Sequence, residues 1–450
     1  MKHFEALLIA APASGSGKTT VTLGLLRHLR ELGRTVAAAK AGHDFIDPLF
    51  HRAASGRSSI NLDPWGMRPA TLRRHAAHAA RDADLLLIEG VMGLFDGTLD
   101  GSGSSADLAA RLGVPVILVV DVYAQGQSVA ALVQGFARFR HDVEVAGVIF
   151  NRVGGERHAQ LLREAMGPID LPVLACLPRC PEMELPERHL GLVLPEEQPD
   201  VEARIAATAR RVGEHLDAQA LLALARPLDV SAADRSLADR SLANHSAPSV
   251  SLPPLGQRIA VARDVAFAFA YPHLLDGWRE AGAELLLFSP LADESPDASA
   301  DAIFLPGGYP ELHAGRLAAG RRFLPGLRRA ARRGVAIYGE CGGFMSLGEG
   351  LEDADGVRHE MAGLLPLETS FAKPHMHLAT SALKLLDGGP LGAAGDAFRA
   401  HEFHFARTVS QGEGDALWQA QAVGSSRAHS VGLRVGSVMG SFFHLIDRVD

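Results

Sequence analysis

The chain has 450 residues, about three times a typical domain length of roughly 150 residues, so we expect two or three domains with a large buried core. Its composition is 47% hydrophobic and 21% charged, which excludes a disordered, collagen-like or coiled-coil protein. The 44 Lys and Arg residues against 52 Asp and Glu residues give a net charge of -8, so we expect no nucleic-acid partner.

Three cysteines, Cys176, Cys180 and Cys341, are too few for a disulfide framework and fit a reducing cytoplasm. The apolar run at 7–12 is short and leads directly into a phosphate-binding pattern, so we interpret it as a first strand rather than a signal peptide. No apolar stretch approaches the roughly 18 to 20 residues that cross a bilayer. We therefore expect a soluble, cytoplasmic protein with no membrane partner.

Short apolar runs recur through the first half, at 7–10, 35–39, 85–88, 115–120 and 146–150. They are continuous rather than alternating, which is typical of strands buried on both faces. Segments that favour helix lie between them, at 19–32, 104–112, 128–139 and 157–165. This alternation predicts a mainly parallel, doubly wound α/β sheet.

The first predicted strand leads into Ala-Pro-Ala-Ser-Gly-Ser-Gly-Lys-Thr-Thr at 11–20, which opens a helix. This is the context of a P-loop, whose backbone N–H groups surround phosphate oxygens. Pro12 replaces the usual leading glycine, but the Ser-Gly-Ser-Gly-Lys-Thr core is intact. We predict a nucleotide site with Lys18 on the outer phosphates and Thr19 on Mg²⁺. Its residues are Ser14, Gly15, Ser16, Gly17, Lys18, Thr19 and Thr20.

Charged side chains follow two further strands. Lys40, Asp44 and Asp47 come after the second strand, where either a phosphate and metal site or a solvated loop fits the local pattern. Glu89 ends the next apolar strand, as the carboxylate of a Walker B motif does. With Thr19 and Asp47, Glu89 supplies the oxygen ligands that Mg²⁺ prefers, so we predict a Mg²⁺ site there.

Other polar residues of the first half carry weaker signals. Asn151 follows an apolar strand and fits either a contact to a base edge or a helix cap. Cys176 and Cys180 have no matching zinc ligands, so we interpret both as structural. Residues 227–255 contain an imperfect Ala-Asp-Arg-Ser-Leu repeat next to Pro-rich sequence, which is typical of an interdomain linker.

After the linker, apolar runs at 258–262, 284–288, 302–305 and 335–338 predict a second α/β domain that ends in a strand-like stretch at 438–444. The fourth run leads into Gly339-Glu340-Cys341-Gly342-Gly343. Glycines on both sides of a cysteine permit the sharp, strained turn of a nucleophile elbow, although a buried cysteine in a glycine turn fits the same pattern. Cys341 is therefore the candidate nucleophile, and the N–H groups of Gly308 and Gly342 are the candidate oxyanion hole.

A cysteine nucleophile needs a base to form its thiolate. The candidates are His375, His377, His401, His404 and His444. Spacing along the chain cannot choose among them, because catalytic partners meet in space. His444 follows the last short strand and has the best local context, whereas His401 and His404 are typical of loop or substrate-wall residues.

Together the two halves resemble the cobyrinic acid a,c-diamide synthase family, which includes hydrogenobyrinic acid a,c-diamide synthases. These are glutamine-dependent amidotransferases of cobalamin biosynthesis. The resemblance spans nearly the whole chain and is carried by the segments at 14–19, 40–48, 61–65, 89–97, 185–191, 262–271, 307–311, 339–345 and 401–405. The first half is also similar to dethiobiotin synthetase, and the second half is similar to class I glutamine amidotransferases.

The resemblance implies that Lys18 and Lys40 bind the phosphates of ATP, that Thr19, Asp47 and Glu89 bind Mg²⁺, and that Asn151 contacts adenine. It implies that Cys341 is the nucleophile and His444 its base. Such domains often carry an acid two residues after the histidine, where this chain has Ile446 followed by Asp447. We therefore predict a Cys-His dyad and leave the orienting group open. The change of the family's Gly-Pro-Asp-Tyr to Gly42-His43-Asp44-Phe45 leaves the role of that loop open as well.

The implied domains are an ATP-binding amidoligase at 1–226, the linker at 227–255 and a glutamine amidotransferase at 256–450. The implied reaction is ATP- and glutamine-dependent amidation of the a and c acetate carboxylates of cobyrinic or hydrogenobyrinic acid, through an acyl phosphate and released ammonia. The partners are then the corrinoid and L-glutamine, and a homodimer is left open. Cobyric acid synthase, an amidase of a nickel-containing tetrapyrrole and a nucleotide-dependent switch with a degenerate glutaminase domain are the alternatives. The Asp-Pro-Trp and Leu-Pro-Glu-Arg-His stretches favour the a,c-diamide enzyme.

Overall fold

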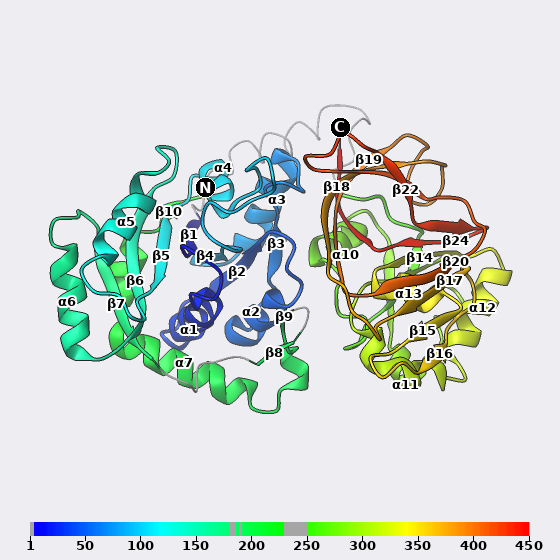
Figure 1. Ribbon diagram of the computed structural model, residues 1–450, viewed down its shortest axis with the longest axis horizontal. Helices are drawn as coiled ribbons and strands as arrows, with labels where there is room; N and C mark the ends of the chain where they lie inside the picture. Colours follow the sequence, from blue (N-terminus) through cyan, green and yellow to red (C-terminus); the bar gives the residue numbers. More distant parts are fainter. Residues whose placement is uncertain (1–3, 180–185, 189–190, 229–250, 450) are drawn as a thin grey trace. The chain divides into compact units, whose positions relative to one another are not determined.

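The structure is a computed structural model that describes residues 4–179, 186–188, 191–228 and 251–449 (Figure 1). The chain divides into two compact units, Met1–His245 and Ser246–Asp450. The predicted repeat of the linker, Cys180 and His189 lie outside the described residues. Because the division between the units falls there too, the predicted domain boundaries stay a prediction.

The first unit is built on one sheet whose parallel strands are buried along most of their length. Its described strands run in the order β3-β2-β4-β1-β5-β6-β7, and neighbours along this path are parallel. Apolar sequence such as Glu-Ala-Leu-Leu-Ile-Ala in β1 forms these strands because both faces of the sheet are covered. The strands are β1 (Glu5–Ala10), β2 (Val36–Ala41), β3 (Ile60–Leu62), β4 (Leu85–Glu89), β5 (Val116–Asp121), β6 (Val145–Val153) and β7 (Val173–Pro178), with the short β10 (Arg226–Pro227) antiparallel to β1 and a separate pair β8 (Glu187–Arg188) and β9 (Gly191–Leu192).

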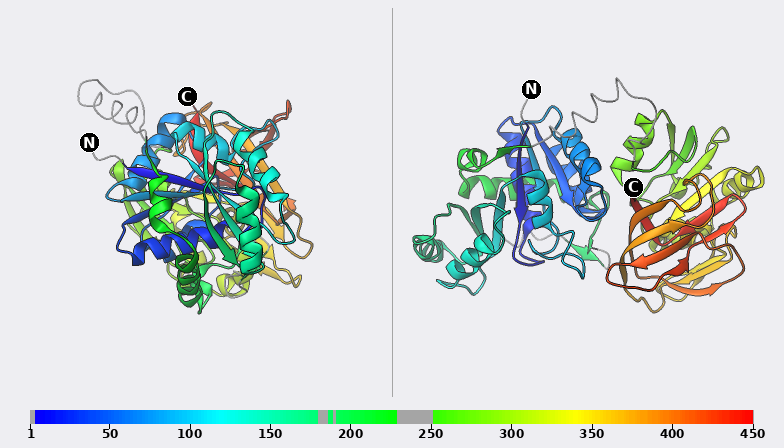
Figure 2. Two further views of the ribbon diagram at one scale, coloured as in Figure 1. Left: turned by 90° about the vertical axis from the view of Figure 1, so that its left-hand side faces the viewer. Right: turned by 90° about the horizontal axis from the view of Figure 1, so that it is seen from above.

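Helices cover both faces of this sheet (Figures 1 and 2). They are α1 (Lys18–Glu31), α2 (Asp47–Ser55), α3 (Pro69–Ala80), α4 (Ser105–Leu112), α5 (Val129–Arg138), α6 (Glu156–Met166), α7 (Val201–His215) and α8 (Ala218–Ala223). Helices α1, α2 and α7 contact one another. Helix α1 lies close to α7 at Gly24, which has no side chain; a Cβ there would lie only 2.6 Å from Val212 Cγ2. A capping box between Ser104 and Asp107 begins α4. All strand C-termini of the parallel path meet at one edge, where the candidate site lies.

The second unit also holds a mainly parallel sheet, with strands in the order β12-β11-β13-β14-β24-β23, of which β23 is antiparallel. Its strands are β11 (Arg258–Ala262), β12 (Glu284–Phe288), β13 (Ala302–Leu305), β14 (Ala336–Glu340), β23 (Leu433–Val435) and β24 (Val438–Ser441). Its helices are α10 (Pro272–Glu280), α11 (Ala314–Ala318), α12 (Phe323–Arg332) and α13 (Gly342–Leu347), with 3-10 turns at Pro290–Ala292 and Pro310–His313. One apolar core joins Ile303, Leu305 and Ile337 of the sheet with Phe323 and Leu327 of α12. Phe304 packs edge to face against Trp278 of α10, with ring centroids 5.4 Å apart. The predicted fold class is confirmed for both units.

Two further sheets of the second unit, the first mixed and the second antiparallel, are not evident from the sequence patterns (Figure 1). Their orders are β16-β15-β17-β20 and β22-β21-β18-β19-β25. The strands are β15 (Gly350–Glu352), β16 (Arg358–Glu360), β17 (Leu367–Ser370), β18 (His377–Leu385), β19 (Ala397–His404), β20 (Arg407–Gln411), β21 (Trp418–Ala422), β22 (His429–Val431) and β25 (Phe443–Val449). The stretch predicted as one strand at 438–444 is instead divided between β24 and β25, which belong to different sheets.

Candidate active sites

The predicted P-loop forms the turn between β1 and α1. Gly15 and Gly17 have φ angles of +76° and +86°, which favour glycine, and Gly17 caps the N-terminus of α1. A Cβ at Gly17 would overlap Asn151 Nδ2, which donates a hydrogen bond to Ser16 O at 3.0 Å. The loop therefore leads into the N-terminus of α1, and the backbone N–H groups at a helix N-terminus are a favourable position for phosphate.

Lys18 is the first residue of α1 and is largely buried. Its Nζ donates a hydrogen bond to Met92 O at 2.6 Å, in the loop that follows β4. That loop is fixed to the P-loop because the N–H of Leu94 donates to Ala11 O at 2.8 Å. Burial, helped by the positive charge of Lys40, lowers the pKa of Lys18. An anionic ligand at the loop would favour the charged ammonium again.

The three predicted Mg²⁺ ligands lie together at the ends of the parallel strands. Thr19 Oγ1 donates a hydrogen bond to Glu89 Oε1 at 2.6 Å and lies 3.5 Å from Asp47 Oδ2. Lys40 Nζ lies between the two carboxylates, 2.5 Å from Asp47 Oδ2 and 2.8 Å from Glu89 Oε1. Two carboxylates and a hydroxyl oxygen form a donor set that fits Mg²⁺. The Lys40 ammonium is the cation that balances these carboxylates in the structure.

The charges of this cluster depend on one another because its groups are buried. Burial disfavours the Lys40 ammonium, but Asp47, Glu89 and Asp44 outweigh it and raise the pKa of Lys40. Burial and the charge of Asp44 raise the pKa of Asp47. Burial opposes ionisation of Glu89, but Lys40 and His51 lower its pKa below the usual range. The sequence analysis did not identify His51, whose Nε2 lies 2.7 Å from Glu89 Oε2.

Asn151 and Arg152 reach the P-loop from β6. Asn151 hydrogen-bonds the loop backbone, as described above, and its predicted contact with adenine stays a prediction. Arg152 has a φ angle of +61°, and its guanidinium donates to Gly15 O at 3.0 Å and pairs with Asp121 Oδ2 at 2.6 Å. Asp121 ends β5, as Glu89 ends β4, so its strand-end position was the signal that could have identified this pair from the sequence.

The predicted nucleophile elbow joins β14 to α13 in the second unit. Cys341 has φ +48° and ψ -107°, a strained conformation for a residue with a side chain. Its N–H donates to Ser441 O at 2.8 Å, which fixes the turn to β24. A Cβ at Gly343 would overlap Leu305 O, and a Cβ at Gly339 would lie 2.8 Å from the carbonyl carbon of Gly343. The glycines at 339 and 343 therefore permit a turn that other residues would block.

The candidate oxyanion donors lie close together at this turn. A Cβ at Gly342 would lie 3.0 Å from the N atom of Gly308, so the two backbone segments are adjacent. A Cβ at Gly308 would overlap Ala266 O, so glycine is also required there. The structure thus brings Gly308 and Gly342 to one place, next to Cys341, and their role as an oxyanion hole stays a prediction.

Cys341 is buried, with 1% of its surface exposed, and its Sγ lies 4.0 Å from Phe403 O. Burial, together with the negative charge of Glu311, raises the pKa of the Cys341 thiol. The cysteine is therefore a thiol at neutral pH unless a neighbouring base removes its proton.

His444 is the candidate base that the structure places next to Cys341. A Cβ at Gly307 would lie 2.5 Å from His444 Cε1, 3.2 Å from His444 Nε2 and 3.2 Å from Cys341 Cβ. His444 is the second residue of β25 rather than a residue after the last strand. His377 and His404 stack on each other with ring centroids 4.6 Å apart, and His404 also stacks on Phe442 at 3.9 Å.

Comparison with known proteins adds to this geometry. Residues 7–193 match the CobQ/CobB/MinD/ParA nucleotide binding domain, and residues 258–448 match the CobB/CobQ-like glutamine amidotransferase domain. Over 445 residues the chain is 53% identical to a hydrogenobyrinate a,c-diamide synthase of Brucella anthropi, and the alignment covers 98% of both chains. The chain belongs to the hydrogenobyrinate a,c-diamide synthase family. Proteins of the same name from Sinorhizobium sp and Rhizobium meliloti are 53% and 52% identical, over 98% of this chain and 99% of each of theirs.

Membership of the hydrogenobyrinate a,c-diamide synthase family confirms the predicted family and the prediction of an enzyme, a glutamine-dependent amide-forming ligase. It argues against the alternative of a nucleotide switch. The roles of individual site residues stay predictions. No helix in the described part of the chain is long and apolar enough to cross a membrane. Cys176, predicted to be structural, is buried in β7, and burial raises the pKa of its thiol.

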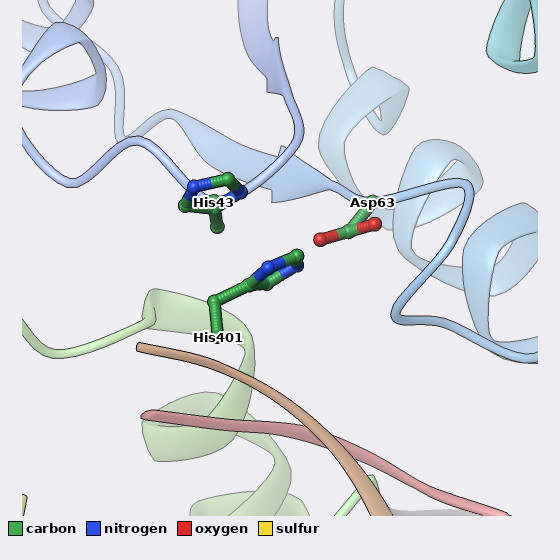
Figure 3. Close-up of side chains that lie close together, drawn as sticks. All are labelled: His43, Asp63 and His401. Atoms are coloured by element: carbon green, nitrogen blue, oxygen red, sulfur yellow. The ribbon is translucent and has the colours of Figure 1, made fainter. Parts of the chain in front are cut away.

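Three further side chains from segments that carry the family resemblance are drawn in Figure 3. His43 and Asp63 follow β2 and β3 in the first unit, and their potential ligand atoms lie within 4.8 Å of each other. The N–H groups of Trp65 and Gly66 donate to Asp63 Oδ1 at 2.9 and 2.6 Å, which fixes the turn around Asp63.

His401, the third side chain of Figure 3, belongs to the second unit. Its Nδ1 lies 3.0 Å from Thr380 Oγ1. Of the two alternatives predicted for His401 and His404, the loop position was wrong, because both lie on β19 and are buried, and a place in the substrate wall stays a prediction. The reason is that β19 pairs with β18 on one side and with β25 on the other.

Proposed function

We propose that this chain uses ATP and glutamine to amidate the a and c acetate carboxylates of hydrogenobyrinic acid. The observation that carries the proposal is that one chain, 53% identical to hydrogenobyrinate a,c-diamide synthases along 98% of its length, contains both a P-loop with clustered carboxylates and a strained cysteine elbow beside a histidine. The name of these relatives favours the cobalt-free corrinoid over cobyrinic acid as the substrate.

The first unit performs the activation of the carboxylate. A carboxylate is a poor acyl donor because its leaving group would be an oxide. A carboxylate oxygen of the corrinoid therefore attacks the γ-phosphorus of ATP, ADP leaves, and an acyl phosphate is formed. The P-loop N–H groups, Lys18 and Lys40 stabilise the negative charge of the phosphates. Thr19, Asp47 and Glu89 would hold Mg²⁺, which supplies further positive charge at the phosphates when it is bound.

The second unit performs the release of ammonia. His444 accepts the thiol proton of Cys341, and the thiolate attacks the side-chain amide carbon of glutamine. The N–H groups of Gly308 and Gly342 stabilise the oxyanion that forms. The amide nitrogen leaves as ammonia with the proton from His444, and water then hydrolyses the thioester to glutamate. Ammonia attacks the acyl phosphate, phosphate leaves, and an amide is formed, so two amidations consume two ATP and two glutamine.

The location and assembly follow from this chemistry. A reducing cytoplasm is the proposed compartment, because Cys341 must stay a thiol between turnovers. A homodimer stays a prediction, which sedimentation of the full chain tests.

The function is tested by mass spectrometry of hydrogenobyrinic acid and of cobyrinic acid after incubation with the protein, Mg-ATP and glutamine. We expect hydrogenobyrinic acid to be converted to a diamide faster than cobyrinic acid. Conversion of neither compound, with glutaminase activity present, would contradict the proposed substrate but keep the amidotransferase chemistry. Faster conversion of cobyrinic acid would reverse the proposed preference.

A further inference from the structure

The orientation of the His444 imidazole is the part of the cysteine site that the sequence leaves open. The position two residues after His444 is Ile446, which is buried and apolar. We propose that Glu340, the residue before the nucleophile, is the positioning residue that orients His444. This inference rests on the proposed glutaminase function of Cys341 and His444.

The geometry of the His444 ring assigns its two nitrogens to different partners. Glu340 ends β14, and its Oε2 lies 3.6 Å from His444 Nδ1, with only 2% and 3% of the two side chains exposed. The opposite edge of the ring, with Cε1 and Nε2, lies against Gly307, next to Cys341. The carboxylate therefore faces Nδ1, and the Nε2 side of the ring lies toward the Cys341 turn, which is the arrangement that a base needs.

The Glu340 carboxylate is itself held in place. Its Oε1 accepts hydrogen bonds from the hydroxyl of Tyr338 at 3.0 Å and from the N–H of Leu445 at 3.1 Å. Burial, with the nearby charge of Glu340, raises the pKa of Tyr338, so the phenol stays a donor. Tyr338 stacks on Phe304 with ring centroids 5.9 Å apart. Since both of these donors use Oε1, Oε2 is directed toward His444.

This carboxylate has two effects on proton transfer. A hydrogen bond from Nδ1–H to Oε2 selects the tautomer whose Nε2 lone pair accepts the thiol proton. The negative charge then stabilises the imidazolium, and it does so strongly because the site excludes water. The distance of 3.6 Å is longer than a hydrogen bond, and catalytic hydrogen bonds are often long before substrate binds.

Asp447 is the competing carboxylate, because it is the nearest acid after His444 in the sequence. It is fully buried on β25, and its Oδ1 accepts a hydrogen bond from the N–H of Arg448 at 2.9 Å. The 3.6 Å separation of Glu340 Oε2 from His444 Nδ1 is the observation that assigns Glu340, and the two carboxylates can be separated by substitution.

The test is steady-state glutaminase kinetics of the full chain with three variants, Glu340→Gln, Glu340→Asp and Asp447→Asn. Glu340→Gln keeps the size of the side chain but removes its charge, so we expect kcat to fall by about 10²- to 10⁴-fold, with the KM for glutamine changed less than about threefold. Glu340→Asp restores the charge and should recover at least about tenfold of the kcat lost in Glu340→Gln. Asp447→Asn should change kcat less than about threefold, and ammonia-supported amidation reports that each variant is folded.

The outcomes separate this inference from the proposed function. A wild-type chain without glutaminase activity overturns both. An active wild type in which Glu340→Gln keeps its kcat overturns the positioning role alone, as does a large loss of kcat in Asp447→Asn instead. Equal losses in Glu340→Gln and Glu340→Asp, accompanied by a weakened KM, would identify a purely structural role and also overturn the proposal.

Discussion

Gly17→Ala should weaken ATP binding by an amount that the structure allows us to divide into two parts. The backbone at Gly17 has a φ angle of +86°, and a left-handed conformation costs a non-glycine residue about 1–2 kcal/mol. The new Cβ also overlaps Asn151 Nδ2, and displacing that amide removes its hydrogen bond to Ser16 O, worth about 1 kcal/mol. If the free loop relaxes, ATP binding must restore the strained geometry. We therefore expect an affinity loss of about 2–3 kcal/mol, about 30- to 150-fold.

Gly15→Ala is the matched control. Gly15 has a φ angle of +76°, but no atom lies within 4 Å of the Cβ that the substitution would add. Only the conformational part remains, so the expected loss is about 1–2 kcal/mol, about 5- to 30-fold. In an Asn151→Ala background, the effect of Gly17→Ala should shrink to the same size, because the overlap has been removed.

The assay is isothermal titration calorimetry with Mg²⁺ and a non-hydrolysable ATP analogue, and circular dichroism checks that every variant is folded. Equal affinity losses for Gly15→Ala and Gly17→Ala would refute the contribution assigned to the Asn151 overlap. An unchanged effect of Gly17→Ala in the Asn151→Ala background would refute it independently. No loss in either variant would show that the glycine conformations do not limit nucleotide binding.

Three further predictions concern the division of labour and the cysteine turn. Cys341→Ala should abolish glutamine-supported amidation and leave ammonia-supported amidation, whereas Lys18→Ala should abolish both, as measured by product formation with each nitrogen source; loss of both activities in folded Cys341→Ala would contradict this division. Gly343→Ala should lower the melting temperature and abolish glutaminase activity, because the new Cβ overlaps Leu305 O. We expect the free energy of unfolding in denaturant to fall by about 2–4 kcal/mol. An unfolding curve like that of the wild type would show that the turn is not constrained. Burial raises the pKa of the Cys341 thiol, and His444→Ala removes its base. In this variant the rate of alkylation of Cys341 by iodoacetamide should rise about tenfold per pH unit from pH 7 to 9. A rate that does not depend on pH would disprove the raised pKa.

The nucleotide site could be predicted from the sequence because its residues follow strands of a parallel sheet. Glu89 ends β4, and Thr19 and Asp47 follow β1 and β2, which flank β4 in the sheet. The C-terminal ends of parallel strands meet at one edge, so local patterns were enough to bring these residues together. The contacts of Lys40 with both carboxylates needed only the same reasoning.

The cysteine site could be predicted only in part. The Gly-x-Cys-x-Gly pattern identifies the elbow locally, but His444 is separated from Cys341 by more than 100 residues of chain. Its approach depends on the pairing of β14 with β24 and on the antiparallel sheet that holds β25, whose strands gave no clear apolar runs. Glu340 could not be predicted from the spacing of acids after the histidine, because it lies on the nucleophile's own strand. Arg152 depends on a positive φ angle that no sequence pattern indicates.

The attachment of Cys341 to β24 also determines when the cysteine site can become active during synthesis. The Cys341 N–H donates a hydrogen bond to Ser441 O, and His444 follows three residues later in β25. A nascent or truncated chain that stops before β24 already contains the nucleophile but contains neither its anchor nor its base. Because burial raises the pKa of that thiol in the folded unit, the proposed release of ammonia begins only when β24 and β25 have been made and have paired. A chain that stops before these strands would therefore not hydrolyse glutamine.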